Sequence, residues 1–97
     1  MYLVVAYDVV SDRRRARLAR KLLDFLPRLQ KSVFEGELPE RRLPALMRVI
    51  AANVALEEDS VRVYHLCSGC RRQVEGIGAT RASAVDSEDA FDEILDN

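Results

Sequence analysis

The chain has 97 residues, of which 48% are hydrophobic and 32% are charged, as in an ordinary globular protein of one small domain. No stretch approaches the roughly 18 apolar residues of a membrane span, so we expect no membrane partner. The net charge of −1 hides an asymmetry, because residues 1–50 carry 11 basic and 6 acidic side chains while residues 51–97 carry 4 and 10. A basic half of this kind can bind nucleic acid, and the alternative is that the helices simply carry solvated charged faces.

The first residues lack the basic region, long apolar segment and cleavage site of a signal peptide, so we expect a cytoplasmic protein. They form instead an almost unbroken apolar run over residues 1–8, which predicts a strand buried on both faces. Asp8 ends this run where the strand reaches solvent. A lone acid there is a candidate metal ligand, and the alternative is that it caps the following turn. Arg13, Arg14 and Arg15 lie just beyond and could hold a phosphate backbone nearby.

A helix is expected from Ser11 or Asp12 to about Leu26, because apolar residues recur at helical spacing along it. Basic side chains occupy the remaining surface of this helix, namely Arg13, Arg14, Arg17, Arg20 and Lys21. The three arginines at its start lie where the helix dipole favours acids. Basic residues at a helix start are tolerated in many proteins, but a cluster of them predicts that an anionic group is expected there.

Residues 28–38 alternate in polarity and predict one long strand. We expect a bulge near Ser32 or Gly36 to divide this strand and to bend it toward a second sheet. Pro39 and Pro44 fall early in a second helix. A polar turn at residues 57–60 precedes an alternating strand over residues 61–66, and residues 72–77 predict a short last strand. The order corresponds to a ferredoxin-like β-α-β-β-α-β domain of the α+β class with one strand added, over residues 1–78, followed by an acidic tail at residues 79–97.

The histidine and the two cysteines receive structural interpretations. His65 lies in an alternating strand without an acid or nucleophile nearby in sequence, so we interpret it as a partly buried strand residue rather than a general base. Cys67 and Cys70 have the spacing of half a zinc site, but a structural zinc takes four ligands. We therefore favour reduced thiols or an occasional disulfide.

Several separated segments occur in a recognisable order. They are Tyr-Asp after the first strand (residues 7–8), the arginine-rich helix, Ser-Val-Phe-Glu-Gly (residues 32–36), Asp-Ser-Val-Arg-Val-Tyr (residues 59–64) and the Cys-x-x-Cys pair. In this order the chain resembles the CRISPR-associated protein two family over roughly residues 1–78. The tail lies outside the resemblance.

This resemblance implies a homodimer in which the last strand of each protomer joins the other protomer's sheet. It implies a role in spacer acquisition, in which the dimer holds duplex DNA and bridges two dimers of the CRISPR integrase. It also implies an endonuclease that uses Mg²⁺, or Mn²⁺ in its place, on RNA or DNA, with Asp8 as the catalytic metal ligand. The resemblance further assigns nucleic-acid contacts to Tyr7, Arg13, Arg14, Arg15, Arg17 and Phe34.

Magnesium commonly takes one or two protein carboxylates, so two copies of Asp8 that meet across a dimer axis would suffice. Two arginine-rich helices would then form a positive surface that follows a duplex without reading its bases. We weigh a non-catalytic scaffold against a nuclease with its own turnover. The alternative outside both is a ferredoxin-like regulatory or toxin module without a CRISPR role, because this fold hosts many functions.

Overall fold

The computed structural model describes residues 1–78, so the acidic tail expected at residues 79–97 lies outside the described part. Its main elements follow the order β-α-β-β-α-β, and they are β1 (Tyr2–Asp8), α1 (Asp12–Leu22), β2 (Arg28–Gln30), β3 (Val33–Glu37), α2 (Leu43–Ala52) and β4 (Ser60–Leu66). A short 3-10 helix (Glu40–Arg42) leads into α2, and a short helix α3 (Ser68–Arg72) follows β4.

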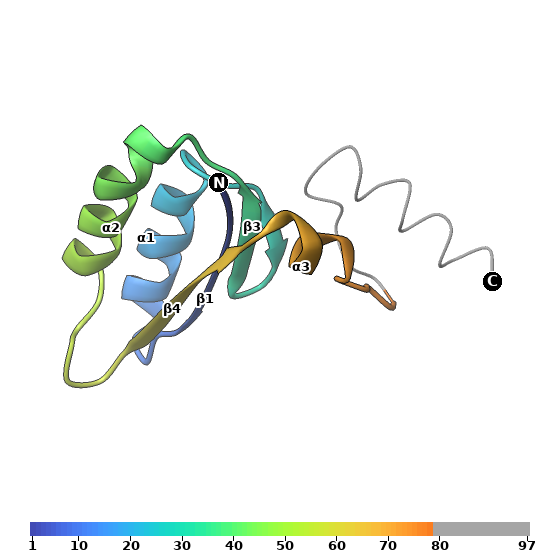
Figure 1. The fold of residues 1–97 in the computed structure, drawn as a ribbon. Helices are drawn as coiled ribbons and strands as arrows, with labels where there is room; N and C mark the ends of the chain where they lie inside the picture. Colours follow the sequence, from blue (N-terminus) through green and yellow to red (C-terminus); the bar gives the residue numbers. More distant parts are fainter. Residues whose placement is uncertain (79–97) are drawn as a thin grey trace.

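The strands form one antiparallel sheet in the order β2-β3-β1-β4. Helices α1 and α2 lie side by side against one face of this sheet, and α3 lies on its other side (Figure 1). This is the ferredoxin-like arrangement that the sequence predicts. Among the described residues, no helix combines the length and the apolar character needed to cross a membrane.

The hydrophobic core lies between the sheet and the two long helices. Leu3, Val5 and Tyr7 alternate along β1 and pack against buried residues of α1 and α2, among them Leu18 and Leu46. The intervening side chains of β1 point to the opposite face, where Val4 and Ala6 are only half-buried. The prediction that β1 is buried on both faces is therefore wrong for a single chain, because α1 and α2 cover one face alone.

Helix α1 begins as predicted, because the Ser11 hydroxyl accepts a hydrogen bond from the backbone N–H of Arg14 at 3.2 Å. The regular helix ends at Leu22, and one further turn leads to Leu26, whose N–H donates to the carbonyl of Leu22 at 3.0 Å. The second helix starts later than Pro39, because the 3-10 turn separates this proline from α2.

The long strand expected over residues 28–38 is a hairpin. The chain reverses at residues 31–32, and β2 pairs antiparallel with β3 within the same sheet. The predicted bend toward a second sheet is wrong, because the break at Ser32 is a turn rather than a bulge. Gly36 allows the hairpin to close on Pro27, since a Cβ at position 36 would lie 2.8 Å from the Cδ of that proline.

The last strand expected over residues 72–77 is absent from the described structure. Cys67 instead caps α3, and residues 73–77 follow the helix without regular structure. The guanidinium carbon of Arg71 in α3 lies 4.0 Å from the centroid of the Tyr2 ring, and the Tyr2 hydroxyl donates to Glu35 at 2.7 Å. Helix α3 therefore covers the Tyr2 end of the sheet face that α1 and α2 leave open.

Candidate functional site

Asp8 is the exposed last residue of β1, and it lies on the open face of the sheet. Its side chain follows Tyr2, Val4 and Ala6 on that face, and its backbone is in register with Ser60 of β4. Within residues 1–78 the Asp8 carboxylate makes no hydrogen bond or ion pair. Because Ser11 caps the following helix, the alternative of Asp8 as a local cap finds no support.

A single chain does not supply a complete metal site around Asp8. Residues 1–78 contain no group of three or more His, Cys, Asp or Glu side chains close enough to share an ion. Magnesium can use as few as one or two protein carboxylates when water and phosphate oxygens fill the other positions. Asp8 is thus suited to such an ion only as one member of a larger set of ligands.

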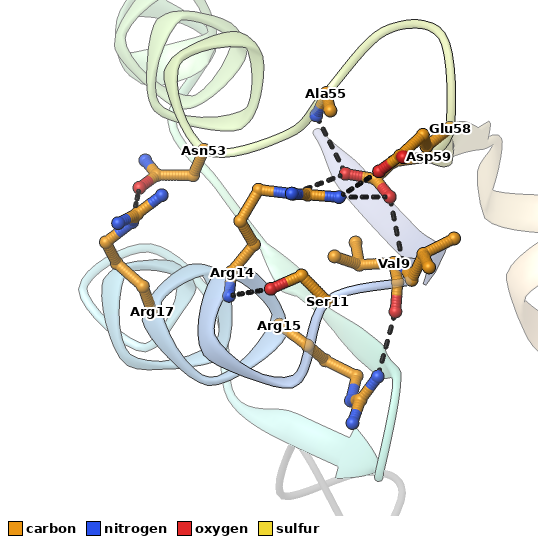
Figure 2. A network of polar contacts seen from close by, with 10 residues as sticks. Val9, Ser11, Arg14, Arg15, Arg17, Asn53, Ala55, Glu58 and Asp59 are labelled. Carbon is orange, nitrogen blue, oxygen red and sulfur yellow. Dashed lines mark hydrogen bonds and ion pairs between the residues drawn. The ribbon is translucent and has the colours of Figure 1, made fainter.

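The carboxylate of Asp59 joins the loop between β1 and α1 to the loop between α2 and β4 (Figure 2). This carboxylate accepts hydrogen bonds from the backbone N–H of Val10 at 2.9 Å and from that of Ala55 at 2.7 Å. It also accepts from Arg14, whose Nε lies 3.0 Å from one of its oxygens. The Arg14 guanidinium, followed by the N–H of Ala55, lowers the pKa of Asp59 from 3.8 to about 2. We call Arg14 and Asp59, with these backbone donors, the Asp59 clamp.

Three of the four predicted DNA-binding arginines are engaged within the chain (Figure 2). Arg14 contacts both Asp59 and Glu58, the latter at 2.8 Å, and these two acids raise the pKa of its guanidinium. Arg15 donates to the Val9 carbonyl at 2.8 Å and pairs with Asp12. Through these contacts, Arg14 and Arg15 stabilise the end of the domain where β1 passes into α1.

Arg17 joins the two long helices, because its Nε donates to the Asn53 side chain at 2.8 Å at the end of α2. Arg13 differs from the other three. It is exposed and makes no hydrogen bond or ion pair with another of the described residues. Of these four arginines, Arg13 is therefore the one whose whole guanidinium is free for a phosphate within residues 1–78.

Tyr7 and Phe34 lie in the core, and this burial argues against the nucleic-acid contacts predicted for them. Phe34 is 0% exposed and Tyr7 is 6% exposed, and their rings stack with centroids 6.2 Å apart. The Tyr7 hydroxyl donates to the carbonyl of Lys31 at 3.3 Å. Burial raises the pKa of this hydroxyl, although the positive charges of Arg28 and Arg15 oppose the shift. Neither ring has a surface on which a base could stack in this conformation.

His65 and the two cysteines are all exposed. The expectation of a partly buried His65 is therefore wrong, because β4 lies at the edge of the sheet. Sequence reasoning also missed Asp59, which it placed in a polar turn. A signal was present, since an acid directly before a strand is well placed to accept backbone N–H groups, but its partner Arg14 lies 45 residues away.

Comparison with known proteins places these features in a family. The family described as CRISPR associated protein Cas2 matches residues 1–74. The chain is 48% identical over 66 residues to a CRISPR-associated endoribonuclease Cas2 of Thermus thermophilus, which covers 68% of this chain and 70% of the relative. A CRISPR-associated endoribonuclease Cas2 of Chloroflexus aurantiacus is 35% identical over 79 residues, covering 80% of this chain and 85% of the relative.

The fold agrees with that assignment. The crystal structure of Streptococcus pyogenes Cas2 matches with a TM-score of 0.71 and 28% identity, covering 80% of this chain and 100% of that chain. A hypothetical protein of Thermus thermophilus matches with a TM-score of 0.74 and 36% identity, covering 86% of this chain and 96% of that chain. By sequence and by fold, the chain belongs to the Cas2 family of CRISPR-associated proteins.

Proposed function

We propose that this chain acts as a homodimer that holds nucleic acid during CRISPR spacer acquisition and can cleave phosphodiester bonds through Asp8. The observation that carries the proposal is the position of Asp8, which is exposed, free of partners within residues 1–78 and located on an uncovered sheet face. The names of the relatives, endoribonuclease and endonuclease, support cleavage of nucleic acid, and the first of them supports RNA as a substrate.

Two features support dimerisation through this part of the molecule. Strand β4 lies at the edge of the sheet and is seven residues long, and an edge of this kind can pair with a strand of another chain. Residues 73–77 carry Val74 and Ile77, which are 51% and 84% exposed. An exchange in which this segment adds to the partner's β4 would bury both side chains and would restore the last strand that the sequence predicts.

The dimer would also complete the acidic site. If the open sheet faces meet about a twofold axis, each protomer contributes one Asp8, and two carboxylates are sufficient for Mg²⁺ or Mn²⁺. Such an ion neutralises charge that develops on the phosphate and lowers the pKa of a bound water. In this arrangement the residues of the chain hold the ion and orient the phosphate.

Integrase bridging and DNA holding are supported by family membership together with the exposed charge of Arg13. Two copies of Arg13 in a dimer would contact phosphates without reading bases, which suits a protein that accepts spacers of any sequence. Membership in a CRISPR-associated family argues against the alternative of a regulatory or toxin module without a CRISPR role.

The proposal is tested by comparing Asp8→Ala with Asp24→Ala, a matched change of another exposed acid beyond the end of α1. Metal-dependent cleavage of RNA and duplex DNA should be lost in Asp8→Ala and retained in Asp24→Ala. An integration assay with the cognate integrase should still succeed with Asp8→Ala if DNA holding does not need cleavage. Undiminished cleavage by Asp8→Ala would remove Asp8 from the mechanism, and a monomeric protein in sedimentation would remove the dimer.

A further inference from the structure

Cys67 and Cys70 lie together where β4 passes into α3, at the Tyr2 end of the sheet. Both side chains are exposed. The backbone of Cys67 is extended, with φ −70° and ψ 166°, and this conformation directs its sulfur over the first turn of α3. There the backbone N–H of Cys70 donates to Cys67 Sγ at a distance of 3.4 Å.

This turn holds the two thiols close to the geometry of a disulfide. The backbone N–H and the thiol of Cys70 both donate to Cys67 Sγ, so the two sulfurs already lie within hydrogen-bond reach of each other. A disulfide brings two such sulfurs to about 2.0 Å with Cβ atoms about 3.5–4.5 Å apart, so closure requires only a local adjustment of this turn. In an extended segment the same residues would be separated by about 10 Å, too far for a bond. The helical start of α3 thus brings together two thiols that a strand at this position would separate.

The two thiols also differ in acidity. The pKa of the Cys67 thiol lies below its ordinary value, first because the N–H of Cys70 donates to its sulfur and then because the Cys70 thiol does so. The pKa of Cys70 is raised, because its thiol proton is held by Cys67 and because negative charge on Cys67 opposes a second ionisation. Cys67 is therefore the thiol suited to attack a disulfide, and Cys70 is the thiol suited to resolve the mixed disulfide that forms.

We propose that Cys67 and Cys70 form a thiol–disulfide exchange site whose oxidising substrate is a low-molecular-weight disulfide. The Cys67 thiolate attacks one sulfur of that disulfide, which forms a mixed disulfide and releases one thiolate. Cys70 then gives up its proton and attacks Cys67 Sγ, which displaces the second thiol. In total, the protein loses two electrons and two protons, and one external disulfide becomes two thiols.

The competing use of the pair is a shared zinc site. Within residues 1–78 no third His, Cys, Asp or Glu joins the two cysteines as a group that could hold a metal. A structural zinc takes four ligands, so it would need a second chain to supply two more thiolates. Such a site would bind one ion for every two chains and would protect all four sulfurs from exchange.

The experiment treats the full chain with glutathione disulfide at neutral pH, followed by acid quenching and mass spectrometry. The wild type should lose the mass of two hydrogens without a lasting glutathione adduct, because Cys70 resolves the intermediate. Cys70→Ser should retain one adduct on Cys67. Cys70→Ser should also react faster than Cys67→Ser, because it retains the backbone N–H at position 70 that lowers the pKa of Cys67; the expected factor is about three- to fourfold for each unit by which the thiol pKa of Cys70→Ser lies below that of Cys67→Ser. The exposed Ser68→Ala keeps both thiols and should behave as the wild type.

Three results would overturn the proposal. The first is a wild type that accumulates two glutathione adducts, because Cys70 then fails to resolve. The second is Cys67→Ser reacting as fast as Cys70→Ser, which would remove the assignment of the attacking sulfur. The third is zinc bound at one ion per two chains, with all four thiols protected. Asp8-dependent cleavage is scored separately, so failure here leaves the proposed function untouched.

Discussion

The arginines of α1 allow a sharp test of how the protein would hold DNA. Of the predicted cluster, Arg13 is exposed and without partners among residues 1–78, whereas Arg14 is paired with Asp59 and Glu58. A side chain that neutralises a phosphate releases counterions, so it steepens the dependence of affinity on salt. A side chain whose charge is already matched by two acids has little left to contribute. We therefore expect Arg13→Ala and Arg14→Ala to affect DNA binding in different ways.

The size of the effect follows from one phosphate contact per protomer. Each neutralised phosphate contributes about 0.9 to the slope of log affinity against log salt, so a dimer that loses two Arg13 contacts should lose about 1.8. Over a fourfold rise in salt concentration, for example from 50 to 200 mM, the wild type should therefore lose about 12-fold more affinity than Arg13→Ala. Arg14→Ala should keep the slope of the wild type and unfold at a lower denaturant concentration, because it removes a member of the Asp59 clamp.

Fluorescence anisotropy with duplexes of unrelated sequence at several salt concentrations measures both slopes. Arg13→Lys is the matched control, since it retains the charge and should retain the slope. Loss of affinity for one sequence alone would contradict phosphate contact. An unchanged salt slope in Arg13→Ala, or an equal reduction of the slope in Arg14→Ala, would refute the reasoning that Arg13 contacts phosphate while Arg14 serves the fold.

Two further predictions concern the elements that support the site. Gly36→Ala should destabilise the protein by about 1–3 kcal/mol in urea unfolding, because its Cβ would lie 2.8 Å from Pro27, whose ring cannot move aside freely. Gly69→Ala is the control, since its Cβ would lie an ordinary 4.0 Å from Cys67 Sγ, and equal stability of the two variants would contradict this account. The Asp59 clamp predicts a pH dependence, because the pKa of Asp59 falls from 3.8 to about 2 on folding. Its contribution should be complete above pH 3.8 and be lost as the pH falls through about 2, and an Asp59→Asn variant with the acid sensitivity of the wild type in this interval would disprove it.

The sequence was sufficient for the order of the elements from β1 to β4, because periodicity is a local signal. The apolar run that forms β1 and the Ser11 cap of α1 could both be identified from a few neighbouring residues. The sequence did not determine which face of each strand is buried or which residues form pairs. Phe34 alternates along its strand, and alternation alone does not state which set of side chains meets the helices.

Long-range partners account for the other differences. Arg14 pairs with acids in the loop that follows α2. The residues near position 14 do not indicate that this loop lies beside Arg14, so the pairing could not be predicted from the local sequence. The segment at residues 72–77 has the composition of a strand, but a strand needs a neighbour. In the single chain, the capping contact of Cys67 with Cys70 starts a helix before this segment. Asp8 could be placed correctly because it depends only on where β1 ends.

The Asp59 clamp also constrains how this protein can vary. Asp59 accepts hydrogen bonds from both loops at the Asp8 end, so a single carboxylate links their backbones. Replacement of Asp59 alone would leave Arg14 with Glu58, whose carboxylate accepts no hydrogen bond from the backbone N–H of Val10 or Ala55 among the described residues. We therefore expect exchanges at positions 14 and 59 to be coupled, because a change at either one leaves the charge of the other without its main partner.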